Sequence, residues 1–156
     1  PNVAPKEAPM YDERLKPGAK PLPIKGKDLS GAPVTLAQFK GKVLLVDFWA
    51  TWCGPCVAEL PNVIAAYNKF HAKGFEVLGV SLDQENSLGK VKAFIKSHKM
   101  PWQQIYDGKY WQAANAVAYG VQSIPFTLLI GRDGKIAAVG ARGGELAPAI
   151  AKALKQ

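Results

Sequence analysis

A nearly unbroken run of apolar residues occupies positions 43–50. Seven of the eight residues from Val43 to Ala50 are apolar, and Asp47 is the exception. Such a run is typical of a strand that helices cover on both faces. The pattern therefore predicts a central strand of a parallel sheet.

A helical repeat follows this strand almost at once. After Cys56 the apolar positions recur every three or four residues, at Val57, Leu60, Ile64 and Tyr67. This spacing predicts one apolar face of an amphipathic helix. The residues between the two elements then lie at a strand-to-helix junction, where unpaired backbone N–H groups and the positive end of the helix dipole favour an anion.

Strand and helix signals alternate along the rest of the chain. We expect strands over 75–82 and 103–106, and helices over 88–98, 110–119 and 146–154. Two alternating segments, 126–130 and 135–140, flank Asp133-Gly134, which predicts a two-residue hairpin. The alternation favours an α/β fold with helices on both sides of a sheet.

The only two cysteines lie at the predicted junction, in the order Cys53-Gly54-Pro55-Cys56. We expect the helix N-terminus to lower the pKa of Cys53 and to make its thiolate the nucleophile. Pro55 suits the first turn of a helix, and Gly54 allows a partner chain to approach the sulfur. Cys56, one turn further, is expected to be the buried member of the pair.

This pair predicts thiol-disulfide exchange. Cys53 attacks a substrate disulfide, and Cys56 then attacks Cys53 to release the reduced substrate. A zinc site normally needs four ligands, and the chain has no second cysteine pair. A static cross-link closing so short a loop would restrict the unfolded chain little.

Two acidic residues are candidates for moving the proton of Cys56. Asp47 interrupts the apolar strand, so we expect it to be protonated, hydrogen-bonded or reached by water, either as a proton relay or as a satisfied structural aspartate. Glu59 lies one helical turn beyond Cys56 and is either a second relay or a solvated surface residue. If both acids serve one transfer, their titrations are coupled.

The segment from Val46 to Cys56 resembles the active-site segment of the thioredoxin superfamily. Glu59 and Pro61 extend the match to Trp-Cys-x-x-Cys-x-x-Glu-x-Pro, which resembles the extracytoplasmic TlpA-like, ResA-like and CcmG-like oxidoreductases. Ile124-Pro125 resembles the cis-proline loop of that family. The resemblance covers roughly residues 22–154 and implies a thioredoxin-like fold, a central mixed sheet flanked by helices, with an N-terminal hairpin extension and a central strand-helix insertion.

The resemblance also implies roles for site residues. Pro125 joins the acids and cysteines in the catalytic set, and substrate contacts are expected at Trp52, Gly54, Pro55 and Ile124. We expect Trp49 to be a core residue. The aromatic residues of the insertion are expected mostly to pack: Trp102, Tyr106, Tyr110 and Trp111.

The first 21 residues differ in composition from the rest. Six of the twelve prolines lie within the first 23 residues, together with several lysines. This composition predicts an extended lead or tether over 1–21 and a thioredoxin-like domain over 22–156. The chain begins with Pro1, which suggests removal of a signal, release from a membrane anchor or deliberate truncation.

The net charge of +8 favours acidic partners or anionic surfaces, but the lysines are scattered and no nucleic-acid-binding module accompanies them.

The resemblance and the cysteine pair together lead us to expect a monomeric reductase of protein disulfides that is periplasmic or otherwise extracytoplasmic. We expect it to use no cofactor or metal and to receive electrons from a membrane-embedded donor. Cytochrome c maturation and metalloprotein assembly are the expected settings. The alternatives are a thiol peroxidase of related fold and a Cu(I)-binding module that uses the same two cysteines.

Overall fold

A five-stranded mixed sheet forms the centre of the molecule in the computed structural model, which describes residues 10–156. The strand order is β5-β4-β3-β6-β7. β3 pairs in parallel with β4, and β4 with β5, whereas β6 and β7 run antiparallel to their neighbours. Their bounds are β3 Val43–Trp49, β4 Phe75–Ser81, β5 Gln103–Tyr106, β6 Phe126–Ile130 and β7 Ile136–Val139.

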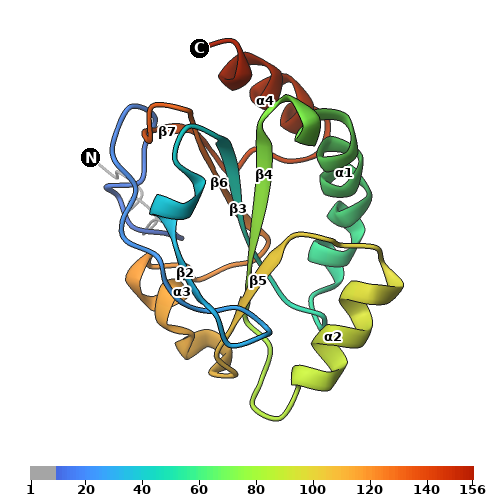
Figure 1. Ribbon diagram of the computed structural model, residues 1–156. Helices are drawn as coiled ribbons and strands as arrows, with labels where there is room; N and C mark the ends of the chain where they lie inside the picture. Colours follow the sequence, from blue (N-terminus) through green and yellow to red (C-terminus); the bar gives the residue numbers. More distant parts are fainter. Residues whose placement is uncertain (1–9) are drawn as a thin grey trace, which may run out of the picture.

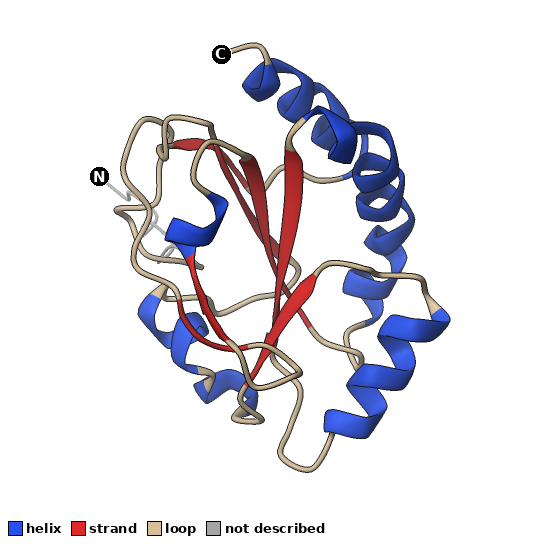
Figure 2. Cartoon of the chain, viewed as in Figure 1, coloured by secondary structure: helices blue, strands red, loops and turns tan. Residues whose placement is uncertain are grey.

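Helices cover both faces of this sheet (Figures 1 and 2). On one face lie α1 (Gly54–Phe70), α2 (Leu88–Ser97) and α4 (Leu146–Leu154). On the other lie α3 (Ala114–Ala118) and a small hairpin of β1 (Lys25–Lys27) and β2 (Pro33–Thr35). The α/β fold predicted from the sequence, its N-terminal hairpin and its strand-helix insertion are confirmed.

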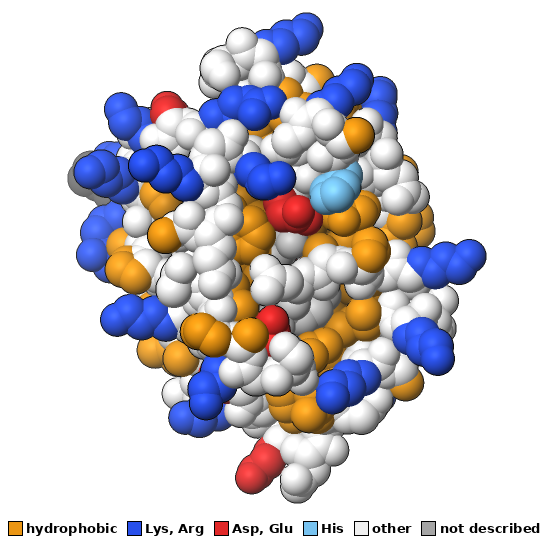
Figure 3. Space-filling view, viewed as in Figure 1, with side chains coloured by type: hydrophobic (Ala, Val, Ile, Leu, Met, Phe, Trp, Pro, Cys, Tyr) orange, Lys and Arg blue, Asp and Glu red, His pale blue; other side chains and the backbone are white. Residues whose placement is uncertain are grey.

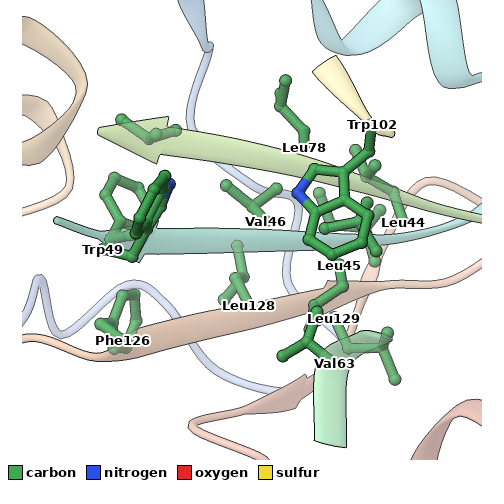
Figure 4. Close-up of a cluster of buried hydrophobic side chains, with 14 of the residues drawn as sticks. Leu44, Leu45, Val46, Trp49, Val63, Leu78, Trp102, Phe126, Leu128 and Leu129 are labelled. Atoms are coloured by element: carbon green, nitrogen blue, oxygen red, sulfur yellow. The ribbon is translucent and has the colours of Figure 1, made fainter. Parts of the chain in front are cut away.

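The core is centred on β3, whose seven residues are all buried. Leu45 and Trp49 of β3, labelled in Figure 4, belong to the face covered by α1 and α2. There Trp49 packs against Phe94 of α2. Phe48 packs on the opposite face, against Tyr119 at the end of α3. The continuous apolar run in the sequence thus reflects a strand buried on both sides.

The buried face of α1 differs in part from the predicted one. Cys56, Leu60, Val63, Ala66 and Phe70 are buried, whereas Val57, Ile64 and Tyr67 are only half-buried. The helix is rotated relative to the predicted stripe because α4 and β4 both pack against it and cover a second row of positions.

Two other local expectations need correction. The β6–β7 connection is a five-residue loop closed by Gly131 N and Lys135 O, not a two-residue hairpin. Gly134 still adopts the left-handed backbone that favours glycine, with φ of 80°. The helix expected over 110–119 is broken at Ala113 into a 3-10 turn, Tyr110–Gln112, and α3.

Residues 10–21 contain no helix or strand, as expected of a lead, but they pack along the domain. Leu15 is buried, and Tyr11 stacks on Phe126. Gly18 and Ala19 exchange backbone hydrogen bonds with Ile136 of β7. This part of the lead is therefore not a free tether, and residues 1–9 lie outside the described residues.

Candidate active site

The two cysteines lie where β3 passes into α1, as the sequence predicts, and they form a disulfide. Cys53 is the N-cap of α1, and its Sγ accepts a hydrogen bond from the Cys56 backbone N–H at 3.2 Å. Pro55 lies in the first turn of α1, where a backbone N–H would have no partner within the helix, so its absence costs no hydrogen bond. This end of the helix is built to stabilise a negative charge on the Cys53 sulfur.

Both cysteines are equally buried, each with 4% of its surface exposed. The expectation that Cys56 alone is buried is wrong, because Cys53 is covered by the neighbouring Ile124 loop. Gly54 and Pro55 between them are exposed, and the position of a Cβ on Gly54 is open to solvent. A partner chain can therefore approach the disulfide over Gly54.

The Ile124–Pro125 peptide bond is cis, as expected. The Ile124 carbonyl oxygen lies 3.8 Å from the Cys53 Sγ, and both residues of this bond are half-buried. Beside them is a groove of about 320 Å³, lined by Met10, Tyr11, Ser123, Pro125, Phe126, Thr127, Gly140 and Arg142. The loop thus places the Ile124 carbonyl and a concave surface next to the disulfide.

Asp47 is buried, with 5% of its surface exposed. Burial, together with the negative charge of Glu59, raises the pKa of Asp47 to about 7. A carboxyl with such a pKa exchanges its proton near neutral pH, which suits a relay.

Glu59 is half-buried and does not point freely into solvent. One carboxylate oxygen accepts the Gly143 backbone N–H at 2.6 Å, and the other accepts the Asn62 side-chain N–H at 3.1 Å. Glu59 is therefore hydrogen-bonded on both oxygens, and its charge acts on Asp47.

The two tryptophans of the motif differ as expected. Trp49 is 1% exposed and Trp52 is 41% exposed. The Trp52 ring packs against Tyr110 and Trp111, with centroids 5.3 Å and 5.8 Å away, and Tyr110 is itself 37% exposed. These two residues, from a set of four aromatic residues of which most were expected to pack, thus extend an aromatic surface that begins beside Cys53.

Sequence reasoning did not identify Asp83, which holds the loop before Cys53. Its buried carboxylate accepts both the backbone N–H and the hydroxyl of Thr51, and the Ser81 hydroxyl at 2.6 Å. Its carbonyl oxygen accepts the Tyr110 N–H. An aspartate two residues after a buried parallel strand could have been noticed, because such positions face ligands and active-site loops.

On the face shown in Figure 3, Lys and Arg side chains are spread around the surface without forming one patch. Over residues 10–156 there is no cluster of three His, Cys, Asp or Glu side chains able to hold a metal ion. No helix in this part of the chain is both long enough and apolar enough to cross a membrane.

Comparisons with known sequences give one consistent result. A family model described as Redoxin matches residues 16–154. The thiol-disulfide oxidoreductase ResA of Bacillus thuringiensis is 31% identical over 126 residues, covering 80% of this chain and 69% of that protein.

Solved structures agree with the sequences. The thioredoxin domain of a thiol-disulfide oxidoreductase from Bacteroides vulgatus matches with a TM-score of 0.75 and 34% identity, over 88% of this chain and 97% of that one. A structure described as the thiol:disulfide interchange protein DsbE of Chlorobium tepidum matches with a TM-score of 0.78 and 30% identity, over 90% of this chain and 99% of that one.

Proposed function

Because this chain belongs to the Redoxin family and is a thiol-disulfide oxidoreductase, we propose that it reduces disulfide bonds in protein substrates outside the cytoplasm. One observation carries the proposal. The Cys53 sulfur accepts the Cys56 N–H at the start of α1 and lies 3.8 Å from the Ile124 carbonyl, beside an exposed Gly54. A nucleophilic sulfur and the half-buried Ile124 peptide are thus presented together.

The reaction follows from this arrangement. In the dithiol form, the Cys53 thiolate attacks one sulfur of the substrate disulfide, and the other substrate sulfur leaves as a thiolate. Cys56 loses its proton to a nearby base and attacks the Cys53 sulfur, which releases the second substrate thiolate. Two electrons pass to the substrate, and the chain is left with the Cys53–Cys56 disulfide seen here.

The groups around the dithiol support distinct roles. Asp47, with a pKa of about 7, is the base for Cys56, and the negative charge of Glu59 helps to raise the pKa of Asp47. An extended substrate segment pairs with the Ile124 backbone next to Pro125, as an added strand does at a sheet edge. Trp52, Gly54 and Pro55 form the opposite side of the contact and are all exposed.

The direction and the setting rest on motif resemblance. A Gly-Pro pair between the cysteines resembles reducing thioredoxins, and the Trp-Cys-x-x-Cys-x-x-Glu-x-Pro motif resembles the extracytoplasmic branch. We infer a monomer that receives electrons from a membrane-embedded dithiol donor. Its substrates are oxidised cysteine pairs, such as those of apocytochrome c or of metal-site assembly proteins.

The first test is the reduction potential of the Cys53–Cys56 couple, measured by equilibration with a thiol buffer and alkylation of free thiols. A value near or below about −250 mV supports a reductase, and a value near about −120 mV overturns the direction.

The second test uses insulin as a model substrate. Cys53→Ser should abolish insulin reduction, and Cys56→Ser should trap a mixed disulfide through Cys53. Stoichiometric retention of Cu(I) by the wild-type protein, combined with no insulin reduction, would replace the oxidoreductase function by metal binding.

A further inference from the structure

A row of four residues crosses the sheet beneath α1 and α2. The strand register places Gln104 of β5 opposite Gly79 of β4, Gly79 opposite Asp47 of β3, and Asp47 opposite Thr127 of β6. Residues in register on neighbouring strands point to the same face of a sheet. The three side chains of this row are polar and are each at most 5% exposed.

Gly79 makes room for the Gln104 side chain. A Cβ built on Gly79 would lie 1.9 Å from the Gln104 Oε1 and 2.6 Å from its Nε2. The amide of Gln104 therefore lies directly over Gly79, between its own strand and the strand that carries Asp47. Adjacent strands are separated by about 4.8 Å, so the amide is about one strand spacing from Asp47.

The orientation of this amide is fixed by Trp49. The Trp49 indole N–H can only donate, and it donates to the Gln104 Oε1 at 2.8 Å. The Gln104 Nε2 is thus the free end of the amide, and among the described residues it has no hydrogen-bond partner. A buried donor without a partner is costly and calls for an explanation.

A second donor of the same kind lies two residues earlier, on the residue that precedes β5. The Trp102 Nε1 is buried and also lacks a partner within residues 10–156. Figure 4 shows the Trp102 indole nitrogen on the side of the ring that faces the Trp49 end of β3. The unpaired Gln104 donor thus lies within the polar row, and the unpaired Trp102 donor lies two residues from it along the chain.

The Asp47 carboxyl is the acceptor that shares this row with Gln104. No side chain or backbone group in the described part of the chain donates a hydrogen bond to it. The charge that acts on Asp47 is the Glu59 carboxylate of α1, and the residue opposite it on β6 is Thr127, whose hydroxyl hydrogen goes to the Ala141 carbonyl. The helix α4, which also packs on β3, buries only apolar side chains. The Thr127 hydroxyl is already engaged, so Gln104 is the neutral donor of this row that has no partner within the described residues.

We propose that Gln104 is a positioning residue that solvates the Asp47 carboxylate through one bridging water, and so sets the pH at which Asp47 accepts the proton of Cys56. A spacing of one strand suits a single water, which needs two to four polar partners. The role of Asp47 toward Cys56 rests on the proposed function, whereas the coupling of Gln104 to Asp47 does not.

The sign of the effect follows from which form is stabilised. A hydrogen bond donated to the charged carboxylate favours that form and lowers its pKa. Gln104 therefore opposes the burial and the Glu59 charge that raise the pKa of Asp47. Removing the amide should move the titration of Asp47 to higher pH.

The wild-type protein allows a direct test in the oxidised state, where the cysteines do not titrate. The side-chain carboxyl carbon of Asp47 and the side-chain amide of Gln104 are followed by NMR as the pH is raised. Both should change with the same midpoint. A Gln104 amide signal that ignores the Asp47 titration overturns the proposal.

Gln104→Met provides the matching variant, because it keeps the length of the side chain and removes the amide. We expect the Asp47 midpoint to rise by about one to two pH units. Gln103→Met is the control, since that exposed side chain bonds Asp28 instead. An unchanged midpoint in Gln104→Met contradicts the proposal.

If Gln104→Met does not fold, Gln104→Glu replaces it, since a carboxylate in the same place cannot donate to Asp47 and should raise the midpoint at least as much. None of these titrations depends on the catalytic activity of the protein. A protein that fails to reduce insulin but retains the coupled titration would refute the proposed function and leave the Gln104–Asp47 coupling standing.

Discussion

The Glu59 carboxylate accepts a hydrogen bond from the Gly143 backbone N–H, with 2.6 Å between oxygen and nitrogen. The bond joins the second turn of α1 to the turn that precedes α4. Glu59 is thereby held with its charge close enough to Asp47 to raise the pKa of that carboxyl.

Glu59→Gln should separate these two effects, because the amide oxygen can still accept the Gly143 N–H while the charge is lost. We expect the pKa of Asp47 to fall from about 7. The fall should be up to about one pH unit, read from the Asp47 carboxyl carbon by NMR. Glu85→Gln, at an exposed position, is the control, and an equal midpoint in all three proteins would show that the Glu59 charge does not reach Asp47.

Asp47 should also make stability depend on pH. Its pKa is about 7 in the folded chain against 3.8 for an unperturbed aspartate, so the folded state holds the proton more tightly than the unfolded state. The resulting stability is fully present below about pH 4 and is lost as the pH rises through 7. The loss is at most about 4 kcal/mol, measured by urea unfolding at a series of pH values.

Asp47→Asn should remove most of this dependence and make the protein more stable than wild type at pH 8. The same variant should slow the attack of Cys56 on the mixed disulfide by roughly tenfold or more near neutral pH, while the first attack by Cys53 changes little. Stopped-flow measurement of both steps checks this, and equal slowing of the two would count against a relay at Asp47.

Asp83→Ala should destabilise the loop that leads into Cys53. The backbone N–H and hydroxyl of Thr51 and the hydroxyl of Ser81 would lose their common acceptor. We expect a loss of about 2–4 kcal/mol in urea unfolding, since buried donors would be left unpaired. Glu85→Ala, two residues further on, should be nearly neutral, and a similar result for both variants would deny Asp83 this function.

Gly79→Ala tests the close approach of Gln104 by a double-mutant cycle. Alone, the added methyl would meet the Gln104 amide at 1.9 Å and should cost about 1–3 kcal/mol of stability. In a Gln104→Ala background the same change should cost clearly less, because the space is then free. If the losses in stability of the two single variants simply add in the double variant, Gly79→Ala and Gln104 do not compete for the same space.

The sequence predicts the parts of the site that depend on neighbours in the chain. The junction of β3 and α1 carries both cysteines, and its identity follows from an apolar run, a helical repeat and a four-residue motif. The burial of Asp47 follows from the same run. These features are local, so periodicity and motif spacing are enough to find them.

The polar row beneath the helices could not be predicted in the same way. Whether Gln104 lies opposite Gly79, and Gly79 opposite Asp47, depends on strand register, which is set by packing over the whole sheet. A signal was nevertheless present, because an isolated glycine inside an apolar strand often marks the close approach of another group. The Glu59–Gly143 bond spans 84 residues and gave no signal in the sequence.

The N-terminal lead shows a limit of composition as evidence. Residues 10–21 contain no helix or strand, in keeping with their prolines, but Leu15 and Tyr11 pack on the domain all the same. A few apolar side chains among prolines are enough to attach an irregular segment when a sheet edge lies nearby.

The bonds between Gly18, Ala19 and Ile136 have a consequence for how the molecule meets its own copies. β7 is the last strand of the sheet, and an uncovered last strand invites pairing with another chain. The lead occupies those backbone groups, and Asp28 bridges Ile105 on the strand at the opposite border. A version of this chain cut at residue 22 would lose the segment that bonds to β7. The exposed β7 edge would then be open to edge-to-edge aggregation.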